Sequence, residues 1–89
     1  MSKKFWNVTI LDIDPVRGKL TICRKKREAG KVTYMLTTVF VEAKAKIKDT
    51  TGKVLKCSSI KPMDKATINY AIESGMLIAS NIIIDKHIL

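Results

Sequence analysis

Three turn signals, each ending in glycine, constrain the fold of this chain more than any other feature. They lie at 14–18 (Asp-Pro-Val-Arg-Gly), 28–30 (Glu-Ala-Gly) and 50–52 (Thr-Thr-Gly), and they divide residues 3–61 into four segments of alternating polar and apolar side chains. Alternation with a period of two is typical of strands, and glycine supplies the left-handed backbone that short hairpin loops need. The spacing therefore predicts an antiparallel meander of four strands.

The lengths of these loops also predict the register of the strands. In the first hairpin Asp14 faces Lys19, and in the second a three-residue loop makes Arg27 face Lys31. Continued along the strands, both hairpins place the same apolar set on one face, which we expect to be a core face. The set consists of Leu11, Ile13, Leu20, Ile22 and Leu36.

The third hairpin predicts a bend in the long segment 31–48. Here Asp49 faces Lys53, so Ile47 pairs with Leu55, and the apolar face consists of odd-numbered residues. The start of the same segment buries the even-numbered Leu36 in the predicted register. Because a strand cannot change faces without a bulge or a sharp coil, we expect a bend near residues 39–41.

Beyond the fourth strand the pattern changes and predicts one helix. Pro62 suits the first helical turn, Gly75 suits the stop, and Ile68, Ala71 and Ile72 form an apolar stripe. The apolar residues 76–84 then predict a C-terminal strand that inserts into or closes the sheet. The predicted fold class is α+β: a small coiled antiparallel meander or half-barrel of about five strands with one helix after strand 4.

The chain has 89 residues, so we expect one domain, 1–89, without a large enclosed active site. The N-terminus lacks the continuous apolar run of a signal peptide, and no stretch is apolar enough to span a bilayer. We therefore expect a cytoplasmic protein without a membrane partner. Cys23 and Cys57 have no metal-ligand spacing and are expected to be reduced, packed thiols, and a disulfide between them would require the fold to bring them together.

The charge is large and unevenly placed. The chain carries 17 Lys and Arg against 8 Asp and Glu, a net charge of +9. Residues 1–61 carry fifteen of the basic and five of the acidic side chains, whereas residues 62–89 are almost neutral. Because such segregation favours a polyanion-binding face, we predict a nucleic-acid-binding protein, DNA or RNA, that contacts mainly the phosphate backbone.

Two clusters carry this prediction. The first is the basic run 24–27 with Lys31 at the tip of the second hairpin, where alternation sends Arg24 and Lys26 to the face opposite the others and places Tyr34 across from Arg24. The second is the lysine face of the third hairpin, where Lys46 opposes Lys56. The candidate nucleic-acid-binding residues are Arg24, Lys25, Lys26, Arg27, Lys31, Lys44, Lys46, Lys48, Lys56, Trp6 and Tyr34.

Other interpretations of the same residues remain open. A basic hairpin tip is often only a solvated loop, and lysines on an edge strand can serve to prevent aggregation. A small accessory or inhibitor protein that binds an acidic protein partner is the alternative function. The apolar C-terminal pair, Ile88 and Leu89, weakly indicates a homodimer.

Catalytic and cofactor signals are scarce. His87 is the only histidine and has no nucleophile near it in sequence. Asp12 and Asp14 could share a strand face as a metal pair would, but Asp14 precedes a proline and is more simply a turn-starter. There is no glycine-rich phosphate loop. We expect no enzyme activity, no metal and no cofactor.

Overall fold

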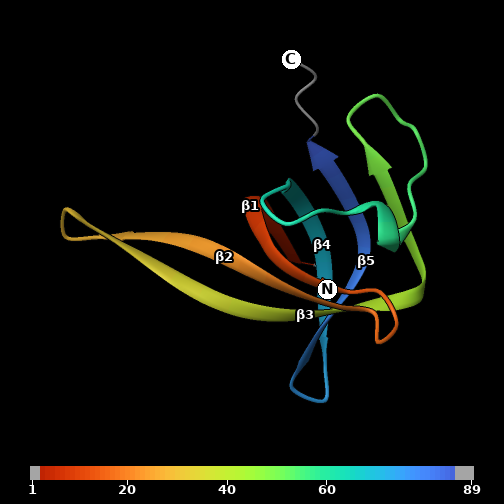
Figure 1. Cartoon of the computed structure of the whole chain (residues 1–89). Coiled ribbons are helices and arrows are strands. Elements are labelled where there is room, and N and C mark those ends of the chain that lie inside the picture. Colours follow the sequence, from red (N-terminus) through yellow and green to blue (C-terminus); the bar gives the residue numbers. More distant parts are fainter. Residues whose placement is uncertain (1–2, 86–89) are drawn as a thin grey trace.

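Five strands close into a barrel in the computed structural model, which describes residues 3–85 of the chain (Figure 1). Around the barrel the order is β1-β2-β3-β5-β4, with β4 next to β1. All neighbours are antiparallel except β3 and β5, which run parallel. The elements are β1 (Lys3–Asp14), β2 (Lys19–Glu28), β3 (Lys31–Asp49), the 3-10 turn η1 (Cys57–Ser59), β4 (Lys65–Glu73) and β5 (Met76–Asp85).

The predicted α+β class is wrong, because no α-helix occurs in residues 3–85 and the predicted helix is strand β4. Ala66, Ile68 and Tyr70 point into the barrel while the residues between them do not, which is the period of a strand. Ser74 and Gly75, both with positive φ, form a two-residue turn into β5. Gly75 therefore serves a hairpin and not a helix end. β5 is the expected C-terminal strand, and it lies between β3 and β4.

The predicted register of the second hairpin is wrong by one residue. Glu28 pairs with Lys31, and the loop has only two residues, Ala29 and Gly30, with φ of 49° and 79°. Two consecutive left-handed residues fit the twist of a tight hairpin. As a result Leu20 pairs with Val39, which is buried, while Leu36 points outward.

With the observed register, the long segment 31–48 does not need the change of inward face that was predicted for it. Val39 and Ile47 are both odd-numbered and buried, so the inward side of β3 does not change between them, and residues 31–36 are all exposed. β3 instead changes partners: residues 31–40 pair with β2, and residues 40–49 run alongside β5. The irregularity lies between Val41 and Lys46 and concerns the pairing with β5.

The first hairpin confirms the predicted pairing of Asp14 with Lys19 and of Ile13 with Leu20. A register shift between Ile10 and Asp12 then makes Ile10 the partner of Ile22, so Ile10 is buried and Leu11 is not. Asp14 is the turn-starter expected, since its Oδ1 accepts a hydrogen bond from the Arg17 backbone N–H at 3.2 Å.

The predicted fourth strand does not form. The Leu55 backbone N–H donates to the Ile47 carbonyl at 2.8 Å, as the predicted register requires, but the ladder consists of a single bridge between Lys48 and Val54. The chain continues through η1 to Ile60, which is buried. β5 pairs with the opposite edge of the same part of β3, where Lys48 is the partner of Ile83.

The barrel interior is filled by one apolar cluster, to which every strand contributes. Its members are Phe5, Val8, Ile10, Leu20, Ile22, Val39, Ile47, Ile60, Ala66, Ile68, Tyr70, Ala79, Ile82 and Ile84. Among residues 3–85 no buried side-chain N or O atom lacks a hydrogen-bond partner. Within the same range, no helix is long and apolar enough to cross a membrane.

Candidate functional site

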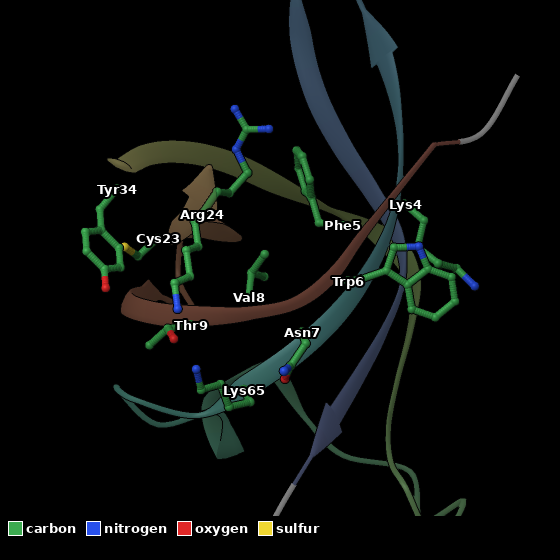
Figure 2. Close-up of a pocket in the computed structure, with 11 residues that line it drawn as sticks. Lys4, Phe5, Trp6, Asn7, Val8, Thr9, Cys23, Arg24, Tyr34 and Lys65 are labelled. Carbon is green, nitrogen blue, oxygen red and sulfur yellow. The ribbon is translucent and has the colours of Figure 1, made fainter. Parts of the chain in front are cut away.

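A cleft opens where β1 and β2 separate. β1 pairs with β2 only from Thr9 onward, where Thr9 faces Cys23, and its earlier residues pair with β4. β2 meanwhile continues past Cys23 with β3 as far as Glu28. The two strands diverge, and the space between them is a cleft of about 470 Å³ (Figure 2). This volume is in the range of small-molecule sites.

The floor of the cleft is apolar. Phe5 and Val8 are buried core residues of β1 that also line the cleft. Phe5 stacks on Tyr70, with 4.1 Å between ring centroids, so the Phe5 ring is packed against the barrel core. A rigid apolar base favours ligands that carry some apolar surface.

The Arg24 side chain lies across one end of this floor and not out in solvent. Its Cζ atom is 4.8 Å from the Phe5 ring centroid, and its Nε–H donates to Thr37 Oγ1 at 3.0 Å. The guanidinium is thus held by a cation–π contact and a hydrogen bond at the same time. Arg24 lines the cleft in a fixed position.

An irregularity in β1 shapes the opposite rim. The register of β1 against β4 shifts between Phe5 and Val8, as at a β-bulge, and Asn7 has φ of 48°. The Asn7 backbone N–H donates to Thr67 Oγ1 at 3.3 Å. Bulges re-aim neighbouring side chains, and this one leaves Trp6 71% exposed at the rim. Lys4 Nζ lies 4.3 Å from the Trp6 ring centroid (Figure 2).

The charge of the cleft has one sign. Lys4, Arg24, Lys25 and Lys65 line it, and no acidic residue does. Lys65 comes from β4, where it pairs with Thr9. Cations gathered around a concave apolar surface focus a positive potential, which attracts anions.

Tyr34 and Cys23 complete the rim on the hairpin side. Lys25 pairs with Tyr34 across the β2–β3 ladder, and Cys23 is two residues away on the same face. Cys23 is half-buried and its thiol is free. The predicted position of Tyr34, opposite Arg24, is wrong by one residue, as the register of this hairpin is.

Four of the predicted site residues therefore meet at the cleft: Trp6, Arg24, Lys25 and Tyr34. Trp6 does so beside Lys4. Sequence reasoning missed Lys4 and Lys65, because the pairing of β1 with β4 has no local signal and Lys65 was assigned to a helix.

The other predicted site residues lie elsewhere. Lys26 Nζ forms an ion pair with Glu28 at 2.8 Å, and Arg27 and Lys31 are exposed near the hairpin tip. Lys46 pairs with Asn81 of β5, and on the other edge of β3 the ladder is the single bridge between Lys48 and Val54, so it does not extend to a pair of Lys46 and Lys56. The remaining lysines of that cluster, Lys44, Lys48 and Lys56, are exposed and line no part of the cleft.

A second groove of about 530 Å³ lies between the β1–β2 loop and β3, and Cys57 lines it. Burial raises the pKa of the Cys57 thiol above 9.0. Cys57 and Cys23 are both free and line different grooves. Within residues 3–85, no three His, Cys, Asp or Glu side chains are grouped as metal ligands would be. His87, Ile88 and Leu89 lie outside the described residues.

No family model matches the sequence, and no curated protein matches it. A solved structure does match the fold: "Crystal structure of Ag(I)CusF" aligns with a TM-score of 0.68 and 18% sequence identity, over 96% of this chain and 99% of that one. At this identity the likeness shows the fold alone.

The ligand in that title is a metal ion and not a nucleic acid, and against this comparison the prediction of DNA or RNA binding is wrong. The structure adds a physical reason, since the basic run does not form one surface: Arg24 is held over Phe5, and Lys26 is paired with Glu28. Neither the acidic protein partner nor the homodimer gains support from the comparison.

Proposed function

We propose that the protein is a small binding protein whose cleft holds a small organic anion. The observation that carries this proposal is the composition of the lining: four cationic side chains and no acidic one, around a floor of Phe5 and Val8. The cations would contact the anionic group, and the apolar floor would cover the rest of the ligand.

We also propose that the protein acts without catalysis. The residues that line the cleft include no carboxylate and no imidazole, which are the usual general bases. Cys23 is the one nucleophilic thiol there, and no base lies among its lining neighbours. A cytoplasmic location is part of the same proposal, supported by two free cysteines in separate grooves.

Silver(I) requires a separate test of fit, because a structure with this fold holds that ion. Soft metal ions prefer thiolate and thioether ligands. Cys23 is the only sulfur-bearing residue that lines the cleft, and four cations line the same cleft. The lining residues do not make a soft-metal site. We therefore propose that the cleft does not bind a soft metal ion. If the protein retained silver(I) in the presence of an excess of a small thiol, this proposal would be wrong.

Isothermal titration calorimetry can test the anion proposal with a matched pair of probes, naphthalene-2-carboxylate and the neutral naphthalene-2-carboxamide. The carboxylate should bind more tightly than the amide, and added salt should reduce the difference. Replacing Lys25 and Lys65 with glutamine should weaken carboxylate binding by about fivefold for each lysine, as ~1 kcal/mol for a charge pair near 4 Å in water implies.

A matched control removes the same charge elsewhere. Lys44→Gln with Lys46→Gln lowers the net charge equally at exposed positions outside the cleft and should leave carboxylate binding unchanged. Equal binding of the two probes, or an equal loss in the control variant, would contradict the proposal.

A further inference from the structure

The β2–β3 hairpin projects beyond the barrel as a twisted two-stranded ribbon (Figure 1). Past Cys23, β2 has β3 as its strand partner, and its other edge is unpaired in this part of the ribbon. Alternation along the ladder sorts its side chains. One side, here called the hairpin face, consists of Lys25 and Arg27 of β2 and Val32, Tyr34 and Leu36 of β3.

The hairpin face exposes apolar side chains that the core does not explain. Val32 is 46% exposed, Tyr34 66% and Leu36 67%. Their spacing places them in one row along β3, each opposite or beside a residue of β2. Contiguous apolar exposure of this kind marks an interaction surface.

The cations on the two sides of the ribbon differ in their partners. On the reverse side Lys26 is paired with Glu28, and Arg24 is held by Thr37 and Phe5. Lys31, predicted on the side of Lys25 and Arg27, lies on the reverse side opposite Glu28 and is the one cation there without such a contact within residues 3–85. On the hairpin face, within residues 3–85, neither Lys25 nor Arg27 has an ion pair, a cation–π contact or a side-chain hydrogen bond. The hairpin face therefore presents uncompensated positive charge together with apolar side chains.

We propose that the hairpin face docks on the surface of an anionic lipid bilayer. The charge of Lys25 and Arg27 complements anionic headgroups, while Tyr34, Val32 and Leu36 would enter the boundary between headgroups and acyl chains. Tyrosine is typical of that boundary, because its ring is apolar and its hydroxyl stays hydrated. A projecting ribbon reaches a flat surface without obstruction from the barrel.

This contact is with the surface of a membrane and does not cross it. It differs from the sequence-based expectation of no membrane partner, and it does not depend on the ligand proposed for the cleft. Lys25 and Tyr34 belong to both the hairpin face and the cleft lining, whereas Arg27, Val32 and Leu36 belong to the hairpin face alone. Variants at these three positions separate the two proposals.

Co-sedimentation of the full chain with vesicles provides the test. We expect binding to vesicles of equal parts phosphatidylcholine and phosphatidylglycerol and little binding to phosphatidylcholine alone. Arg27→Gln should reduce the binding constant about fivefold, the contribution of one cation near an anionic surface. Val32→Ser combined with Leu36→Ser should reduce it further, because burial of apolar area is lost.

Two matched controls remove similar groups elsewhere. Lys44→Gln removes an exposed cation of β3, and Val16→Ser removes an exposed apolar residue of the β1–β2 loop. Neither should change vesicle binding. Equal loss in the control variants would overturn the proposal, and so would absence of binding to anionic vesicles, as expected if the hairpin face instead contacts a protein. Carboxylate binding by Arg27→Gln should be unchanged. Vesicle binding therefore tests the hairpin face, and carboxylate binding separately tests the cleft.

Discussion

Residues 31–40 and residues 40–49 of β3 belong to one strand with one alternation, yet their outward side chains differ in kind. In the first part the outward positions include Val32, Tyr34 and Leu36, and in the second part they include Lys44 and Lys46. The second part follows the usual pattern of a half-buried strand, apolar inside and charged outside. The first part does not follow this pattern. Its apolar side chains are exposed, so packing in the core does not explain them.

The largest expected effect contrasts one residue from each part. Ile47→Ala should lower the free energy of unfolding by about 2–5 kcal/mol, because it leaves a cavity in the core. Leu36→Ala should change it by no more than about 0.5 kcal/mol, because the side chain is exposed. Urea unfolding of both variants measures the difference. A large loss for Leu36→Ala would mean that the hairpin adopts the register expected from sequence, and the comparison between the two parts of β3 would fail.

A smaller effect should come from the turn that begins β3. Ala29 has φ of 49°, a conformation that costs most L-residues about 1 kcal/mol. Ala29→Asn should therefore raise the free energy of unfolding by about 0.5–1 kcal/mol, since Asn-Gly is a preferred pair for this turn. Thermal unfolding provides the measurement. A variant less stable than the parent chain would contradict the two-residue turn and the register that it sets.

The smallest effect should come from the turn at the other end of β3. A hydrogen bond from the Thr51 hydroxyl holds the pKa of Asp49 below its usual 3.8, assisted by the backbone N–H groups of Lys53 and Thr51. Because the folded-state pKa is lowered, the stabilisation is complete above pH 3.8 and is lost as the pH falls through the folded-state value.

Asp49→Ala should accordingly lower the thermal midpoint slightly at neutral pH, and the difference from the parent chain should shrink below about pH 3.8. Asp12→Ala is the matched control, because Asp12 is exposed on β1. A difference that stays constant with pH, or one that the control reproduces, would exclude the proposed role of the Asp49 carboxylate.

The strands of the first two hairpins could be predicted from sequence, but their register could be predicted only for the first, and there only from the turn to the shift between Ile10 and Asp12. Residues 28–30 resemble a three-residue loop ending in glycine, whereas Ala29 itself adopts the left-handed conformation. Alanine gives no sign of this, because its Cβ disfavours that region. Since side chains alternate with a period of two, the one-residue error placed Leu36 in the core instead of Val39 and created an apparent change of face.

The error at β4 had a different cause. Ile68, Ala71 and Ile72 fit a helix, while Ala66, Ile68 and Tyr70 fit a strand, and both patterns are present in one short segment. Pairing with β1 and β5 decides between them, and that information lies far away in the sequence. The same pairing brings Lys65 to the cleft. The hairpin side of the site could thus be predicted, and the β4 side could not.

The divergence of β1 from β2 has a consequence for how this barrel could acquire new ligands. The cleft is set by which strands pair along the backbone, and Lys4, Trp6, Lys25 and Tyr34 contribute exposed side chains to its rim. Substitution of those side chains changes the chemistry of the opening without altering the strand order that creates it. The shape of the opening depends on strand pairing and its chemistry on the exposed side chains, so a barrel of this type can keep the opening while the side chains around it change.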